Sequence, residues 1–303
     1  MPHIQQREIP TERFGPLVEF DGSADSIADV QAFLQQHGYI VLRQGLDRSS
    51  VLNAREEVLT RLAEVGEVSE PIMDGRMTGY SQRPDPIEDQ GAFWKSVNYG
   101  AALRAVTHGP ATHALVATVF GEAARSHDLM YLRPMAPGSA TPLHYDYPFF
   151  AGDSQRILTV WIPLGDVPVT DGPLVIVEDS CRFNDLLDPI RAIDFSQSRS
   201  NDKVQTAAYD AQNALHPVDL ATQRDVRLLS TEFTAGDVVV FHGFTLHGSL
   251  DNTSADDHIR LSCDVRYQPA ADPCSDERYF GANPKGSKGA GYADMRGAKP
   301  LVR

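Results

Sequence analysis

Four side chains from separate segments could together bind a metal ion and an acidic small molecule. His144 and Asp146 stand two residues apart, and His247 and Arg260 follow in a later part of the chain. Two imidazoles and one carboxylate on one face of a metal are the ligand set of non-heme iron(II) oxygenases. A buried arginine keeps its charge and needs an anion, which a dicarboxylate can supply. The pattern predicts oxygen-activating chemistry with an acidic cosubstrate.

The first two candidate ligands lie in a stretch, 141–147, that we expect to be a strand. Side chains alternate along a strand, so His144 and Asp146 would point to the same side. A single His-x-Asp is weak evidence, because most such pairs are solvated surface residues. His242 is the alternative to His247 as the later histidine. It would face the other way in an uninterrupted strand, although Gly243 could break that strand, and we interpret it as structural.

We expect a turn near Asn252 to join strands at 245–250 and 258–267 into a hairpin. If the hairpin closes symmetrically, His247 and Arg260 lie opposite each other on a polar face. The residues between, including Leu261 and Cys263, are apolar and predict a face that packs under helices. The polar face would equally suit the solvent side of an edge hairpin.

Apolar spacing predicts helices in the first part of the chain and strands in the second. Helices are expected over 27–34, with a stop at Gly38, from 51 to an end near Gly66, and over 112–120. A strand is expected at 39–42, and 67–98 reads as long loops. Short strands between Gly and Pro turns are expected at 129–133, 141–147, 157–162, 174–177, 237–241, 245–250 and 258–267.

Many short strands after a helical region predict an α+β fold with a mainly β core. We expect a double-stranded β-helix (a jelly roll of the cupin kind) flanked by N-terminal helices. One domain would cover 1–303, with a helical flank at 1–126, the jelly roll at 127–268 and a tail at 269–303. A polar insert at 181–232 shows no clear strands, and a segment that long is a candidate lid.

Composition limits the partners that the protein can have. A net charge of −14 without a basic run argues against nucleic acid, whose phosphates need lysine and arginine. No apolar run reaches membrane-spanning length, and the N-terminus lacks the apolar core of a secretory signal. Three cysteines without paired spacing make a disulfide framework improbable. We expect a cytoplasmic protein that acts on a small molecule; the oligomeric state stays open.

The ordered set of motifs resembles the phytanoyl-CoA dioxygenase family of iron(II)/2-oxoglutarate oxygenases over most of the chain. The matching segments begin with a Gly-Tyr strand entry at 37–43 and the His-x-Asp at 142–146. Two central strands follow at 161–167 and 171–174, and then the late histidine at 236–249 and the arginine at 260–262. One departure is Glu178-Asp179-Ser180-Cys181, where many members have Pro-Gly-Ser-His. Asp146 is retained, whereas halogenating relatives replace this carboxylate, so halogenation is disfavoured.

The resemblance implies that His144, Asp146 and His247 ligate Fe(II) and that Arg260 binds the distal carboxylate of 2-oxoglutarate. Ser249 would assist Arg260. The implied reaction consumes O2 and 2-oxoglutarate, releases succinate and CO2, and hydroxylates or otherwise oxidises a small-molecule metabolite.

One further assignment follows from the resemblance, and two others follow from position in the sequence. Trp161 would line the cosubstrate pocket, with a core tryptophan as the alternative. Arg266, on the same expected face as Arg260, is the fallback cosubstrate arginine, although we favour a surface or structural ion-pair role for it. Tyr147, Phe149 and Phe150 could form an aromatic wall or ordinary core.

Two other functions remain open at this point. A non-redox metal cupin, such as an isomerase or a hydrolase, would need the three ligands but would have no use for Arg260. A jelly-roll binding protein would hold no metal at all.

Overall fold

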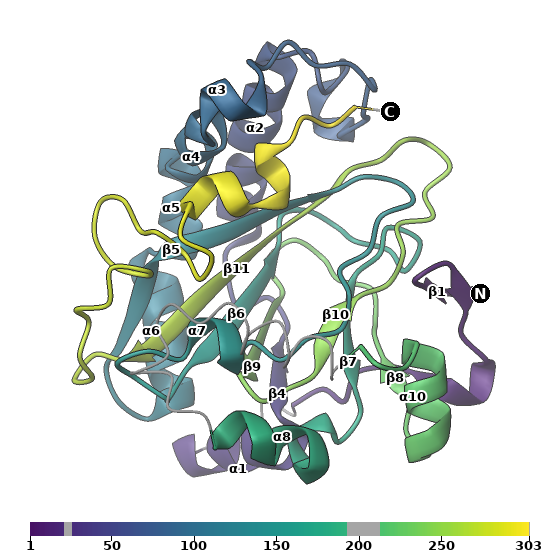
Figure 1. Cartoon of the computed structure of the whole chain (residues 1–303), viewed down its shortest axis with the longest axis vertical. Coiled ribbons are helices and arrows are strands. Elements are labelled where there is room, and N and C mark those ends of the chain that lie inside the picture. Colours follow the sequence, from purple (N-terminus) through teal and green to yellow (C-terminus); the bar gives the residue numbers. More distant parts are fainter. Residues whose placement is uncertain (21–25, 193–212, 303) are drawn as a thin grey trace.

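The structure is a computed structural model that describes residues 1–20, 26–192 and 213–302. Two β-sheets form its centre, and helices lie around them (Figure 1). The α+β class predicted from the sequence is confirmed. Within the described residues, no helix combines the length and the apolar character needed to cross a bilayer.

The larger sheet, which we call the main sheet, has five antiparallel strands. Their order is β4 (Tyr39–Leu42), β9 (Val238–His242), β6 (Leu158–Pro163), β11 (Arg260–Pro269) and β5 (Ala124–Met135). The smaller sheet, the minor sheet, runs β10 (His247–Ser249), β7 (Leu174–Val177), β8 (Leu228–Leu229) and β3 (Phe14–Gly15). Its β3–β8 pair is parallel and its other pairs are antiparallel. A separate two-stranded ribbon joins β1 (His3–Ile4) and β2 (Arg7–Glu8).

Helices account for much of the remaining chain. The α-helices are α1 (Ile27–His37), α2 (Arg48–Glu64), α3 (Pro86–Asp89), α4 (Ala92–Asn98), α5 (Ala101–Thr107), α6 (Pro110–Phe120), α7 (Tyr147–Phe150), α8 (Asn184–Arg191) and α10 (Pro217–Arg224). The 3-10 helices are η1 (Thr11–Arg13), η2 (Ile72–Asp74), η3 (Ser180–Arg182), η4 (Gly291–Asp294) and η5 (Arg296–Ala298).

Helix α1 shows how local sequence sets an element's limits. The Ser26 hydroxyl accepts a hydrogen bond from the Asp29 backbone N–H at the start of the helix. Gly38 ends it in the left-handed region (φ 79°), which glycine adopts without strain. The predicted helix and its stop at Gly38 are confirmed, and strand β4 follows at once as expected.

The outer face of the main sheet packs on the helices. Leu261, Cys263 and Val265 of β11 belong to one apolar cluster with side chains of α1, α2 and α4 to α6. This confirms the predicted apolar face of β11. The inner face is different, because a second apolar cluster between the sheets covers only the β4, β9 and β6 part, including Tyr39 and Phe241. Polar residues occupy the β11 and β5 part.

The expected hairpin between 245–250 and 258–267 does not form. His247 lies in the minor sheet, where it pairs with Ile176, whereas Arg260 lies in the main sheet opposite Met135. The buried Asn252 explains the difference, since its Nδ2 donates to the carbonyls of Met135 (2.9 Å) and His258 (2.8 Å). These bonds tie the connection to the end of β5, so the chain crosses from one sheet to the other.

Two segments that we expected to be irregular contain short helices, and one of them also contains a short strand. The stretch 67–98 includes η2, α3 and α4, and Trp94 of α4 is fully buried. The insert 181–232 includes α8, α10 and β8, which pairs with β7; its residues 193–212 lie outside the described residues. Elements this short span too few residues for a period to be recognised in the sequence.

We expect Ile162→Ala to destabilise the fold by about 2–5 kcal/mol, since it would leave a cavity beneath the helices. Ile162 is fully buried on β6 and belongs to the cluster that joins the main sheet to the helices. Urea denaturation would measure the change in the free energy of unfolding. Ile87, which is 84% exposed, supplies the control, and Ile87→Ala should change stability by less than about 0.5 kcal/mol. Equal effects of the two substitutions would contradict this packing.

Candidate metal centre

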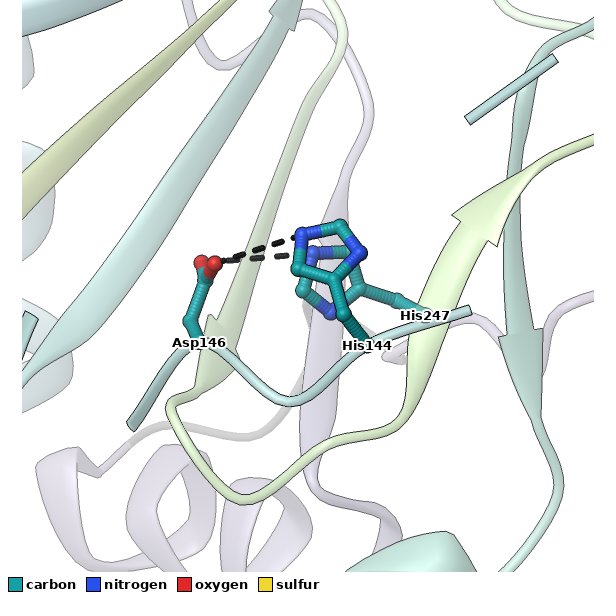
Figure 2. A group of neighbouring side chains, drawn as sticks. All are labelled: His144, Asp146 and His247. Atoms are coloured by element: carbon teal, nitrogen blue, oxygen red, sulfur yellow. Dashed lines mark ion pairs between the residues drawn. The ribbon is translucent and has the colours of Figure 1, made fainter. Parts of the chain in front are cut away.

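His144, Asp146 and His247 come together at the inner side of the two sheets. One ligand atom from each residue lies within 4.8 Å of the others. The three side chains come together from two stretches of chain, one that carries His144 and Asp146 and one that carries His247 (Figure 2). Asp146 and His247 are buried, and the His144 side chain is 13% exposed. Within the described residues this is the one group of three or more potential ligands that meets this criterion.

An isolated backbone bridge between His144 and strand β10 brings the two histidines side by side. The His144 N–H donates to the His247 carbonyl (2.8 Å), and the His247 N–H donates back to His144 (3.1 Å). The expected strand at 141–147 is reduced to this single bridge. Asp146 has helical backbone angles (φ −73°, ψ −29°) because α7 begins at the next residue. The strand alternation that we expected therefore does not align His144 with Asp146; the turn into α7 does.

Both imidazoles present the same nitrogen to the carboxylate. Nδ1 of His144 faces the Pro142 carbonyl, and Nδ1 of His247 faces the Thr245 carbonyl, each at 2.9 Å. A carbonyl only accepts, so Nδ1 carries the proton and Nε2 keeps its lone pair. The Nε2 atoms lie 3.5 Å and 3.9 Å from the Asp146 oxygens. Burial, reinforced by His144, lowers the pKa of His247 to about 3, which keeps it in the neutral form that binds metals.

Side chains from two strands of the main sheet donate hydrogen bonds to the Asp146 carboxylate. Arg266 of β11 donates from Nη2 (2.7 and 2.8 Å) and Nε (3.2 Å), and the Thr159 hydroxyl of β6 donates at 2.5 Å. Burial alone would raise the pKa of Asp146, but Arg266 and the two histidines outweigh it and hold the pKa well below its usual range. The carboxylate is therefore ionised and oriented before any metal binds.

Arg260 lies on the same inner face of β11 and is 2% exposed. Its Nε donates to the Gly172 carbonyl (3.1 Å), and Nη1 donates to the Ser262 hydroxyl. In the described part of the chain no carboxylate forms an ion pair with it. Burial, together with the nearby Arg133 and Arg296, lowers the pKa of Arg260 to about 10. A guanidinium in this position can bind an anion.

The other predicted site residues have varied surroundings. The Ser249 hydroxyl accepts a hydrogen bond from the Thr141 N–H (2.8 Å). Trp161 packs in the core between the sheets, with its ring centroid 4.7 Å from that of Phe233. Arg266 is ion-paired with Asp146, and His242 lies outside the cluster at the end of β9.

A cavity of about 230 Å³ opens onto His144 and Asp146. Phe149 and Phe150 line it, as the sequence suggested for an aromatic wall, whereas Tyr147 lines a separate cavity with His242. Arg133 and Arg296 also line the cavity at the metal centre. Sequence reasoning missed both arginines, and Thr159 as a partner of Asp146, because no local motif marks them.

Comparison with known proteins decides the family. The family model described as phytanoyl-CoA dioxygenase (PhyH) matches residues 34–261, which is most of the chain. The chain belongs to the phytanoyl-CoA dioxygenase family. It is thus an iron- and 2-oxoglutarate-dependent oxygenase that acts on small molecules, and the clustered histidines and aspartate suit this chemistry. The predicted class and cofactors are confirmed, and the non-redox enzyme and the metal-free binding protein are set aside.

Two curated relatives extend this finding across most of the sequence. Both are 1-deoxypentalenic acid 11-beta-hydroxylases, from Streptomyces arenae and Streptomyces exfoliatus. Each is 29% identical to this chain, over 271 and 286 residues, and each match covers 86% of this chain and 88% of the relative.

Solved structures share the fold. The epimerase SnoN, in complex with Fe3+, alpha-ketoglutarate and nogalamycin RO, is 19% identical with a TM-score of 0.52, covering 93% of this chain and 94% of SnoN. The carbocyclase SnoK from nogalamycin biosynthesis is 22% identical with a TM-score of 0.51, covering 84% and 87%.

We expect Arg266→Met to destabilise the metal-free protein by about 3–5 kcal/mol, because it leaves the Asp146 carboxylate buried without its counter-charge. The double variant Arg266→Met with Asp146→Asn should recover part of that loss, since it removes the unpaired charge as well. Urea unfolding of chelator-treated protein would measure both. A double variant no more stable than Arg266→Met alone would show that the ion pair does not have this role.

Proposed function

We propose that this protein hydroxylates a small, largely apolar metabolite, with Fe(II) bound by His144, Asp146 and His247. The observation that supports the ligand assignment is the convergence of their three ligand atoms within 4.8 Å. The donor set also fits, with two neutral imidazole nitrogens and one carboxylate already ionised by Arg266. Hydroxylation is the activity named for the two curated relatives.

We further propose that Arg260 binds the distal carboxylate of 2-oxoglutarate and that Ser249 assists it. Arg260 is buried without a carboxylate partner among the described residues, which is costly unless an anion completes it. Trp161 would border the cosubstrate from the core between the sheets. Bound iron and 2-oxoglutarate supply the oxidising chemistry; the side chains around them bind, orient and shield the reactants.

The protein's own contribution can be traced residue by residue. The Pro142 and Thr245 carbonyls hold the imidazoles with Nε2 toward the carboxylate, and Thr159 and Arg266 hold the carboxylate itself. Phe149 and Phe150 line the cavity and would exclude water from the reacting position.

Three broader assignments belong to the same proposal. The main and minor sheets would be the two halves of a double-stranded β-helix, and residues 1–303 would form one domain with the flank, core, insert and tail given above. The three cysteines are all free, which supports a reducing, cytoplasmic location.

We expect His144→Ala to abolish stoichiometric iron binding, because two ligands remain where three are needed. His242→Ala is a control that should retain iron, since His242 lies on the helix-facing side of β9 and lines a separate cavity. Metal analysis of protein purified and loaded without air measures both. Iron lost from His242→Ala but kept by His144→Ala would overturn the ligand assignment.

We expect Arg260→Met to weaken 2-oxoglutarate binding at least tenfold, since a charge-assisted hydrogen bond contributes about 1.5–3 kcal/mol. Titration of the anaerobic iron protein with 2-oxoglutarate, followed through the visible charge-transfer band, gives the affinity. Iron content should stay unchanged. A larger loss in Arg266→Met, with its iron retained, would reassign the cosubstrate arginine.

A further inference from the structure

The C-terminal segment forms part of the wall of the cavity at the metal centre. Ser287, Lys288, Met295 and Arg296 all line that cavity, as His144 does. The yellow end of the chain lies across β5 and β11 in Figure 1. The sequence predicts only a tail at 269–303, and no motif in it indicates a role at the metal centre.

Positive charge accumulates where this segment meets the main sheet. Arg133 and Arg296 both line the cavity. Burial and the charge of Arg133 lower the pKa values of Arg260 and Arg296, and Arg296 also lowers the pKa of Arg260. Asp264 forms an ion pair with Arg133. Among the residues that the structure describes, no carboxylate pairs with Arg296, whose Nη1 contacts the Met135 sulfur at 3.0 Å. This excess is notable in a chain with a net charge of −14.

Binding of Fe(II) and 2-oxoglutarate would not remove this excess of positive charge. Fe(II) and the dianion of 2-oxoglutarate cancel, and so do the pairs Arg266–Asp146 and Arg133–Asp264. Asp294 is the acidic residue of the tail that lines the cavity, and Lys288 offsets it. The positive charges of Arg260 and Arg296 are left. Arg296 and Lys288 are exposed side chains that line the cavity, so their positive charge is accessible to a second anion bound beside the cosubstrate.

Apart from Thr141 and Ser287, the remaining lining residues of the cavity are apolar or aromatic. Tyr131, Phe149, Phe150 and Met295 face it, and they surround a volume of about 230 Å³ beside His144. Such walls suit a compact hydrocarbon body, while the few polar groups of a pocket set the ligand's orientation.

We propose that the substrate is a compact hydrophobic carboxylic acid and that Arg296, with Arg133 and Lys288, binds its carboxylate. The acid group would sit under the C-terminal segment, and the hydrocarbon body would lie along the aromatic wall beside the metal centre. Arg296 is then a specificity-determining residue contributed by the tail. This inference rests on the proposed function, because it places a substrate in the same cavity.

Paired acids and carboxamides test the proposal. The anaerobic iron protein, saturated with 2-oxoglutarate, is titrated calorimetrically with cyclohexanecarboxylate, adamantane-1-carboxylate and decanoate, and with the neutral primary carboxamide of each. We expect at least one acid to bind roughly tenfold or more tightly than its carboxamide. The charge-transfer band must persist throughout, which shows that the acid has not displaced the cosubstrate.

Variants separate the role of Arg296 from a general charge effect. Arg296→Gln should remove the preference for acids, and Arg296→Lys should restore part of it. Lys299→Gln, an exposed tail residue outside the cavity lining, removes the same charge and should leave the preference intact.

Three results would overturn the proposal. They are acids that bind no better than their carboxamides, a preference that survives in Arg296→Gln, and loss of 2-oxoglutarate binding in Arg296→Gln as large as in Arg260→Met. The last would assign Arg296 to the cosubstrate. If wild-type protein formed no charge-transfer band at all, the proposed function itself would fail, which is a different outcome.

Discussion

The buried ion pair between Asp146 and Arg266 is the interaction on which the rest of the site depends. An ionised carboxylate removed from water is tolerated only with a counter-charge and hydrogen bonds. Arg266 and Thr159 are directly opposite each other on β11 and β6, so two central strands of the main sheet deliver both partners to the same carboxylate. The Asp146 oxygens thereby have a defined position before any metal is present.

The histidines add a second constraint, which is that both sheets must be in place. His247 belongs to β10 of the minor sheet, whereas the groups that hold Asp146 belong to the main sheet. The two-way backbone pairing between His144 and His247 joins the irregular segment before α7 to the minor sheet. A local opening of either sheet would therefore separate the ligands, so metal affinity and the packing of the two sheets are linked.

The inner space between the sheets is divided by polarity. Apolar residues fill the part lined by β4, β9 and β6, including Trp161 and Phe241, and give the sheets their cohesion. Charged residues of β11 and β5 line the other part, and the C-terminal segment lies over it. Arg133, Lys288 and Arg296 line the cavity, so positive charge is concentrated there although the whole protein is acidic, and this charge attracts small anions.

The sequence by itself determined the candidate ligands, the limits of α1 at Gly38 and the apolar face of β11 at Leu261 and Cys263, since each depends on residue type and short spacing. Only the tertiary structure decided that His247 and Arg260 lie in different sheets, that Arg266 pairs with Asp146, and that the tail brings Arg296 to the cavity. Local periodicity reports which side of an element is apolar. It does not report which distant strand becomes the neighbour, because that choice depends on long-range packing and on single contacts such as those of Asn252.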